Sequence, residues 1–490
     1  MSRSKIHGKL TGLIFGLSLI LAISGAVPAQ EWSCDGELAY AVTAELTRPD
    51  YGGRMTGTPG YEKAAEYVAG QLKALGVQPA AGQKYLQTVG KIPPLPTMIL
   101  ASLQRLGPDG AMTRRYRFGQ DFLAMPQAAP AVKAGPAVFI GYGITAKDKN
   151  YDDYAGLDVK GKVAVAFQGA PSFLPAAGDP LQKLDNARAH GAAVLILVDH
   201  PREARPKVEW NPKVMTGKTT LVLAEKALGE DWLAAAGLTP AGCIEMVEAE
   251  KKPVGRALGF DLRLSTVGLM GFKQHPAGNV LGLIPGASGV TGPHLLLCAH
   301  LDHMGTDPDG VVYPGASDNA SGVGVVLEAA AFLSRPENRL PVPVVVAFFA
   351  GEELGFLGAN EYLQKPALPL TGLAAVLNVD VMGGPPNLSC EVDPKYTGLR
   401  GDLAGAAEAL GGLVRIGGLE KDHASDHLPF HQKGIPAAML SNLSRIELMH
   451  IPEDDLSCIE RQTLSAAASY LVEAARRAAE AVQQEGKKAA

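Results

Sequence analysis

Short apolar runs in the second half of the chain have the character of buried strands. They cover Leu295–Ala299, Val342–Ala350, Leu373–Val379 and Ile435–Leu440, and a helical pattern at Val323–Leu333 separates the first two. A short apolar run that is bounded by polar or turn residues is typical of a strand covered on both faces. Because such strands alternate with helices, we predict an α/β fold with a doubly wound, mostly parallel mixed sheet flanked by helices.

The first half of the chain has a different pattern. A helical pattern over residues 36–76 is interrupted by glycines between Tyr51 and Gly60, and proline-rich, irregular strands are expected over 84–125. From Ala131 onward the pattern indicates a second unit, with strands at 137–144, 161–167 and 192–198 and a helix at 181–191. Its strand ends carry no cluster of His, Asp and Glu. We therefore expect a structural or substrate-covering unit without chemistry of its own.

A chain of 490 residues is too long for one ordinary core, so two domains are expected. The predicted boundaries place the first part of the main domain at 30–130, the second unit at 131–262 and the rest of the main domain at 263–490. Hydrophobic residues make up 47% and charged residues 19%, as in globular proteins. The net charge of −5 and the pI near 6.2 give no reason to expect a nucleic-acid partner.

The first residues have the features of a secretory signal. Arg3, Lys5 and Lys9 precede an apolar stretch over residues 13–26, and Val27-Pro-Ala supplies a small-residue cleavage pattern. We expect residues 1–29 to be a signal peptide and the protein to be exported, to a periplasm or outside the cell. The alternative is an uncleaved membrane anchor, but the apolar stretch is short for a span of ~20 residues. The mature protein should therefore have no stable membrane anchor.

Candidate catalytic residues follow the predicted strands. The first three apolar runs end at His300, at Glu352-Glu353 and at Asp380, while Asp318 begins a helix and His450 lies in a loop. One carboxylate at a strand end is ordinary, because solvent begins there. Three successive strands that all end in residues able to bind a metal ion are much less expected by chance. In open α/β sheets, ligands bind beyond the carboxyl ends of the strands, so these side chains should meet at one edge.

Five such ligands are too many for one tetrahedral zinc with an open position, and they suit two metal ions that share a bridging carboxylate. Two cations ~3.5–4 Å apart can activate a water molecule and polarise a carbonyl group. Glu352, next to a ligand but not itself one, is placed to act as general base. Asp302 can accept the other ring N–H of His300 and so orient it.

Weaker candidates lie nearby. Asp426 and His427 either face the site, as substrate-binding residues, or cap a turn, and the sequence does not decide between these roles. His303 is expected to be a loop histidine and not a ligand.

Several segments, in order along residues 278–470, resemble metallopeptidase family 28, the co-catalytic zinc aminopeptidase family that also includes glutamate carboxypeptidase II. The resemblance implies a zinc-exopeptidase-like (phosphorylase/hydrolase-like) fold. A second resemblance, at Gly141–Ile144 and Asp152–Val163, is to the protease-associated (PA) domain, a β-rich insertion in many secreted members. Gly53-Arg54 and Thr56-Gly57 resemble the family's N-terminal segment. The segments that resemble the peptidase family are Ala299–Gly305, Pro314–Gly322, Phe348–Gly355, Asn378–Asp380 and His450–Asp454.

The resemblance also implies roles for single residues. In the family, the residues that match His300 and Asp380 bind one zinc ion, those that match Glu353 and His450 bind the other, and the one that matches Asp318 bridges them. Two Zn²⁺ ions per site are thus implied. Glu352 matches the general base and Asp302 the carboxylate that orients the histidine. A cis peptide between Asp318 and Asn319 is implied as well.

We therefore expect a di-zinc exopeptidase that acts on short peptides, most simply an aminopeptidase. A carboxypeptidase of the same family is one alternative, and it needs cations such as Arg415 or Arg445 to hold a free carboxylate. Another is a glutaminyl-cyclase-like transferase, which the resemblance associates with one zinc ion and no PA insertion. The last is a non-catalytic protein that binds partners through its PA domain.

Overall fold

The computed structural model describes residues 32–90, 101–125, 131–200, 218–266, 277–420 and 423–489. The expected signal peptide, residues 1–29, lies outside the described residues. Among the helices that are described, none combines the length and the hydropathy that a membrane span requires.

The first sheet has nine strands in the order β1-β13-β17-β14-β18-β21-β19-β20, with β2 paired to β13. Its four central strands, β17, β14, β18 and β21, are parallel, and antiparallel strands flank them. The predicted mixed α/β sheet is therefore confirmed. The strands are β1 (Gln78–Pro79), β2 (Leu86–Thr88), β13 (Gly278–Ile284), β14 (His294–His300), β17 (Val344–Phe349), β18 (Leu373–Val379), β19 (Leu388–Val392), β20 (Val414–Gly417) and β21 (Ala437–Asn442).

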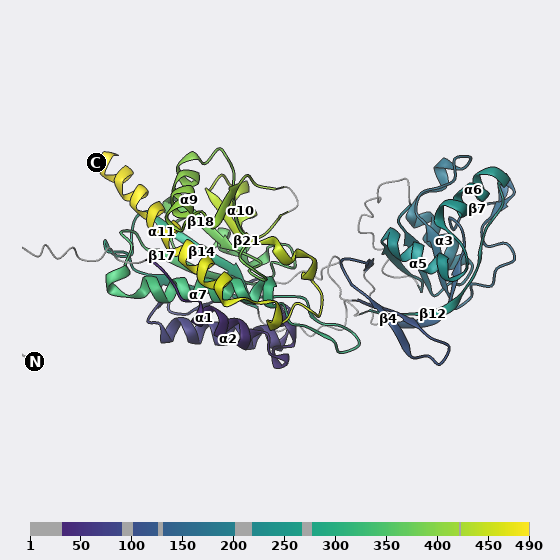
Figure 1. Ribbon diagram of the computed structural model, residues 1–490, viewed down its shortest axis with the longest axis horizontal. Coiled ribbons are helices and arrows are strands. Elements are labelled where there is room, and N and C mark those ends of the chain that lie inside the picture. The colour runs from purple at the N-terminus through teal and green to yellow at the C-terminus, as the bar shows by residue number, and fades with distance from the viewer. Residues whose placement is uncertain are drawn as a thin grey trace, which may run out of the picture. The chain divides into compact units, whose positions relative to one another are not determined.

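Helices cover both faces of this sheet (Figure 1). On one face, Tyr362 of α8 and Phe430 of α10 pack in a buried cluster with Leu296, Cys298 and Val345 of the strands. On the other face, α7 and α11 contact β14 and β18, and α1 packs against both helices. The helices are α1 (Glu37–Leu46), α2 (Pro59–Ala74), α7 (Ser321–Ser334), α8 (Leu357–Gln364), α9 (Thr397–Ala409), α10 (His427–Gln432) and α11 (Arg461–Ala489).

The second sheet has the order β4-β3-β12-β6-β9-β10-β11-β5. Strands β6, β9, β10 and β11 are parallel neighbours, and β3 and β12 extend the sheet in antiparallel pairing. The strands are β3 (Ala101–Leu106), β4 (Met112–Tyr116), β5 (Phe122–Ala124), β6 (Ala131–Phe139), β9 (Val163–Phe167), β10 (Val194–Val198), β11 (Thr220–Ala224) and β12 (Arg256–Thr266). The other α-helices and strands of the described residues are α3 (Pro180–Ala189), α5 (Lys226–Ala235), α6 (Pro240–Glu250) and the short pairs β7 (Thr145–Ala146) with β8 (Tyr151–Asp152) and β15 (Gly305–Thr306) with β16 (Val312–Tyr313).

Two sequence expectations differ from these pairings. The boundary at residues 130/131 assigned 101–124 to the main domain, whereas β3 and β5 pair with β12 and β11 of the second sheet. The strands that pair with β3 and β5 lie about a hundred or more positions away along the chain. The local sequence pattern therefore cannot predict these pairings. The strand expected at 137–144 ends at Phe139, because Gly141 and Gly143 adopt positive φ angles of 63° and 69° that turn the chain.

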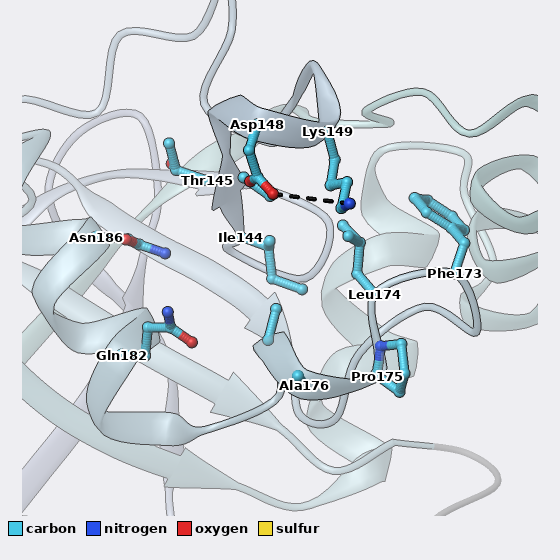
Figure 2. A pocket seen from close by; sticks show the side chains of 12 residues that line it. Ile144, Thr145, Asp148, Lys149, Phe173, Leu174, Pro175, Ala176, Gln182 and Asn186 are labelled. Carbon is cyan, nitrogen blue, oxygen red and sulfur yellow. Dashed lines mark ion pairs between the residues drawn. The ribbon is translucent and has the colours of Figure 1, made fainter.

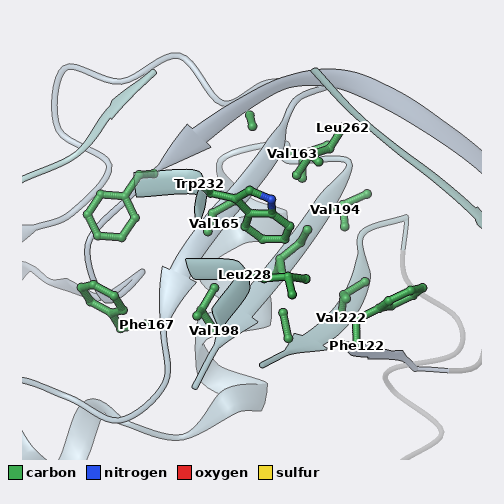
Figure 3. Close-up of a cluster of buried hydrophobic side chains, with 14 of the residues drawn as sticks. Phe122, Val163, Val165, Phe167, Val194, Val198, Val222, Leu228, Trp232 and Leu262 are labelled. Atoms are coloured by element: carbon green, nitrogen blue, oxygen red, sulfur yellow. The ribbon is translucent and has the colours of Figure 1, made fainter. Parts of the chain in front are cut away.

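Trp232 of α5 lies in the hydrophobic core that packs against the second sheet. Its side chain is fully buried, and its indole N–H donates to the hydroxyl of Tyr116 at 2.7 Å. Val165, Val194 and Leu228 belong to the same cluster (Figure 3). A separate pocket of about 340 Å³ opens between the segment around Thr145 and the loop around Leu174 (Figure 2). Its lining is a mixture of apolar, amide and exposed charged side chains, which does not indicate a catalytic site.

Replacing Trp232 with Ala is expected to destabilise this unit by about 3–5 kcal/mol, because a large cavity opens and Tyr116 loses a partner. Urea unfolding followed by circular dichroism measures the change. Val132→Ala, on the exposed part of β6, is the control and should stay within about 0.5 kcal/mol of the parent. A Trp232→Ala variant as stable as the control would contradict this description of the core.

Candidate metal centre

The carboxyl ends of three neighbouring parallel strands bring the candidate residues together. His300 is the last residue of β14 and is in register with Phe349, the last residue of β17. Glu352 and Glu353 follow β17 after a turn at Gly351, whose φ is 66°. Asp380 directly follows β18 on the other side of β14. Because these strands are parallel and in register, the residues that follow them lie at one edge of the sheet, as expected from the sequence.

The first group of side chains forms around His300. Its Nε2 atom lies 3.1 Å from Oδ1 of Asp380 and 3.3 Å from Oδ1 of Asp318. All three residues are buried, and their ligand atoms are close enough to hold one metal ion.

The second group forms around the other oxygen of Asp318. The Nε2 atom of His450 lies 3.1 Å from Oδ2 of Asp318 and 3.1 Å from Oε2 of Glu353. Each oxygen of Asp318 thus faces a different imidazole. This is the arrangement in which a carboxylate can bridge two cations.

The donor types and their spacing fit zinc. Imidazole nitrogens and carboxylate oxygens bind Zn²⁺ at ~2.0–2.2 Å, which places two ligands of one tetrahedral ion about 3.3 Å apart. The separations of 3.1 to 3.3 Å within the two groups agree with that value. The buried carboxylates also require a positive partner, since uncompensated charge in the interior is costly.

The pKa directions reflect this concentration of charge. Burial by itself would raise the pKa of Asp318, but hydrogen bonds from His300 and His450 and the nearby His303 hold that pKa well below its ordinary value. Burial acts in the same way on Glu353, and His450 and His303 lower its pKa to about 2. Both groups are therefore ionised, as metal ligands must be.

Glu352 stands beside these ligands without contacting either imidazole at hydrogen-bond distance. Burial raises its pKa well above the ordinary value, His300 opposes the shift, and the carboxylates of Glu353, Asp380 and Asp426 add to it. The backbone N–H of Glu352 donates to Oδ1 of Asp302 at 3.2 Å, which fixes the start of the turn. A buried carboxyl group with a raised pKa beside candidate metal ligands is suited to proton transfer.

Asp302 lies close to His300, but its backbone oxygen is the nearer acceptor. The Nδ1 atom of His300 is 3.2 Å from the carbonyl oxygen of Asp302 and 3.8 Å from the carboxylate Oδ1. The expected contact with the carboxylate is thus longer than a hydrogen bond. Orientation of His300 by the carboxylate stays a prediction, while the contact of that carboxylate with Glu352 is present.

Asp426 and His427 are both buried, at 0% and 1% exposure. Neither oxygen of Asp426 has a hydrogen-bond partner among the described residues, and burial raises its pKa well above the ordinary value. Burial also lowers the pKa of His427 to about 4. A substrate-binding role for these two residues stays a prediction, and it requires that substrate reach side chains that are covered here.

The turn that carries Asp318 is held from several directions. The peptide between Asp318 and Asn319 is cis, as the family resemblance implied. The side chain of Asn319 donates to the Val379 carbonyl at 2.9 Å and accepts from the Gly322 N–H at 3.1 Å. The bridging position is therefore connected to the end of β18, where Asp380 follows.

Comparison with known families agrees with this geometry. Residues 279–475 match the model of peptidase family M28, and residues 128–239 match the PA domain. The first match contains all five candidate ligands and Glu352. Residues 279–475 thus form a peptidase family M28 domain, and residues 128–239 form a PA domain.

Relatives of this M28 peptidase include named aminopeptidases. The "Probable lipoprotein aminopeptidase LpqL" of Mycobacterium tuberculosis is 26% identical over 77% of this chain and 63% of its own length. "Aminopeptidase YwaD" of Bacillus subtilis is 25% identical over 89% of this chain and 83% of its own. The chain thus spans less than two thirds of the first relative.

A solved zinc aminopeptidase from Bacillus subtilis, BSAP, has the same fold, with a TM-score of 0.55 at 22% identity over 91% of this chain and 95% of its own. The likeness to BSAP shows a shared fold, and the sequence comparisons relate the chain to peptidases that are named aminopeptidases.

Two site residues of the M28 peptidase were not identified from its sequence. His303, expected to be a loop residue, is buried, and its Nδ1 lies 3.0 Å from Oε1 of Glu353. Asp454 accepts hydrogen bonds from the backbone N–H groups of Ser317 and Asp318 at 2.7 and 3.0 Å. Both lie inside motifs that carry ligands, His300-x-x-His303 and His450–Asp454, so their proximity to a ligand in sequence was the available signal.

Proposed function

We propose that this M28 peptidase is an exported di-zinc exopeptidase, an aminopeptidase that hydrolyses the N-terminal bond of short peptides. The single observation that carries the proposal is the division of Asp318 between two imidazole–carboxylate groups, with Glu352 next to both. Sequence similarity to named aminopeptidases supports the direction of cleavage.

In this proposal His300 and Asp380 would hold one zinc ion, Glu353 and His450 would hold the other, and Asp318 would supply an oxygen to each. When bound, zinc supplies Lewis-acid polarisation of the scissile carbonyl and lowers the pKa of a water molecule. His303, which also reaches Glu353, is assigned to orient that carboxylate and leave its Oε2 atom to face His450.

Glu352 carries the proton in this mechanism. Its carboxylate takes a proton from the attacking water and then gives it to the leaving amine, so that one group serves as base and acid in turn. The nearby carboxylates of Glu353, Asp380 and Asp426 favour the protonated form of Glu352, which exists between the two proton transfers. Asp302 holds the backbone of Glu352 and so keeps the carboxylate near the reacting atoms.

The alternatives are less well supported. A carboxypeptidase needs a cation for the free carboxylate, and Arg415 lies exposed on the edge strand β20. A glutaminyl-cyclase-like transferase is disfavoured by the full set of five ligands and by the PA match. A non-catalytic role is disfavoured because the ligand and base positions are all occupied by residues that can perform these functions.

Hydrolysis of a panel of aminoacyl-arylamides, N-acetylated dipeptides and C-amidated dipeptides tests the proposal. We expect cleavage only of substrates with a free amine, complete loss after chelation, and recovery on addition of Zn²⁺. Two zinc ions per chain by elemental analysis should accompany activity.

Cleavage that requires a free carboxylate instead would assign the protein to the carboxypeptidase branch. Binding of two zinc ions without cleavage of any substrate in the panel would contradict the proposed substrate class but not the metal site.

A further inference from the structure

Arg54 is a fully buried arginine whose guanidinium, among the described residues, donates hydrogen bonds to backbone carbonyls alone. Its side chain is 0% exposed, and among the described residues no ion pair includes it. Buried arginines are rare unless they are paired with a carboxylate, because removing the charge from water is costly. The position therefore needs an explanation beyond packing.

The hydrogen bonds of Arg54 join three separate segments of the chain. Nε donates to the Leu301 carbonyl at 3.1 Å, and Nη2 donates to the Gly315 carbonyl at 2.9 Å. Nη1 donates to the carbonyls of Leu46 at 2.9 Å and Pro314 at 2.6 Å. Four of the five guanidinium N–H groups are thus used, in a fixed planar arrangement that lysine cannot reproduce.

These contacts fall on the two segments that carry metal ligands. Leu301 lies between His300 and Asp302, and Gly315 lies three positions before Asp318. One side chain therefore fixes the distance between a terminal ligand and the bridging ligand. The backbone of Arg54 has a φ of +52°, in the left-handed region, next to Gly53, where an added Cβ would collide with the carbonyl oxygen of Gly305. The segment is thus packed closely enough to hold the side chain in place.

The charge of Arg54 also interacts electrostatically with the carboxylates of the site. Burial lowers the pKa of Arg54 to about 10, and Asp454, Asp318, Asp302 and Glu353 oppose that shift. The guanidinium remains charged at neutral pH. It therefore stabilises the ionised carboxylates before any cation enters.

We propose that Arg54 is a positioning residue for the metal centre, which clamps the His300 and Asp318 segments together and supplies a fixed positive charge to their carboxylates. This inference rests on the proposed zinc site. It differs from a general stabilising role because it predicts that zinc affinity changes more than stability does.

The test compares Arg54→Met and Arg54→Lys with the parent and with Arg400→Met. Arg400 also donates to backbone carbonyls, those of Val392, Gly417 and Ile416, but in a part of the chain without ligands. Zinc dissociation constants are measured on the metal-free proteins by competition with a chromophoric chelator. The visible absorption of the Co²⁺-substituted proteins reports ligand geometry independently of activity.

We expect Arg54→Met to weaken zinc binding by about 10–100-fold, the range found when a group that orients a ligand is removed, and to alter the Co²⁺ spectrum. Arg54→Lys, which keeps the charge without the planar set of donors, should fall between Arg54→Met and the parent. Arg400→Met should bind zinc with the affinity of the parent. If Arg54→Met does not fold, the zinc affinity and the Co²⁺ spectrum of Arg54→Lys test the inference instead. A zinc affinity and a Co²⁺ spectrum equal to those of the parent would overturn it.

The inference also fails if Arg54→Met and Arg400→Met lose zinc affinity equally, because the effect would then be a general loss of stability. Failure of the parent itself to bind two zinc ions would instead contradict the proposed function, so the two failures are distinguishable.

Discussion

Replacing Glu352 with Gln is expected to lower kcat/KM for an aminoacyl-arylamide by about 10²–10⁴-fold while two zinc ions remain bound. The amide keeps the size of the side chain but cannot take a proton from the attacking water. The five proposed ligands are untouched, and the backbone N–H of Glu352 can still donate to Asp302. The expected loss corresponds to about 3–5 kcal/mol of transition-state stabilisation. Steady-state kinetics and elemental analysis of the same preparation measure both quantities.

The matched control is Glu361→Gln, a partly buried glutamate of α8 that pairs with Lys365 at 2.6 Å and lies outside the candidate ligand set. Its kinetics and metal content should equal those of the parent. Full activity in Glu352→Gln would exclude this residue as the base. Loss of a zinc ion in the same variant would instead make Glu352 a ligand and require a new assignment of the second group.

Local sequence pattern was sufficient to predict the strands that carry the site. The strand expected at Leu373–Val379 has those bounds as β18, and the helix expected at 323–333 lies within α7. These elements are buried on both faces, so each apolar run ends at the point where the chain leaves the core. For that reason the polar residues that directly follow each run are the best candidates that the sequence pattern offers.

The residues that support the ligands were not predictable in the same way. Arg54 reaches Leu301 across 247 positions, and Asp454 reaches Asp318 across 136. Such contacts depend on how the chain closes on itself, and neither residue belongs to a hydrophobic pattern that would reveal it. The same reason explains the second sheet, whose strand β3 pairs with β12 at the far end of the inserted unit.

Replacing Asp318 with Ala is expected to remove both zinc ions, whereas His450→Ala is expected to remove only one. Asp318 presents Oδ1 to His300 and Oδ2 to His450, so its loss takes a ligand from each position. His450 lies 3.1 Å from Oε2 of Glu353 and 3.1 Å from Oδ2 of Asp318, so its loss leaves His300, Asp380 and Oδ1 of Asp318 in place. Activity should fall below detection in Asp318→Ala and by at least about 10²-fold in His450→Ala, because the carbonyl and the water lose their Lewis acid.

Metal stoichiometry, measured by elemental analysis after dialysis against a fixed free Zn²⁺ concentration, separates these outcomes from misfolding. Circular dichroism confirms that each variant is folded. Asp393→Ala, a carboxylate that pairs with Lys395 outside the candidate ligand set, is the control and should keep two ions. If His450→Ala retains two ions, then His303, whose Nδ1 lies 3.0 Å from Glu353, is the second imidazole ligand, and the His303→Ala variant should show the loss instead. If Asp318→Ala retains one ion at full affinity, the carboxylate does not bridge, and the division of its two oxygens between the imidazoles reflects hydrogen bonding alone.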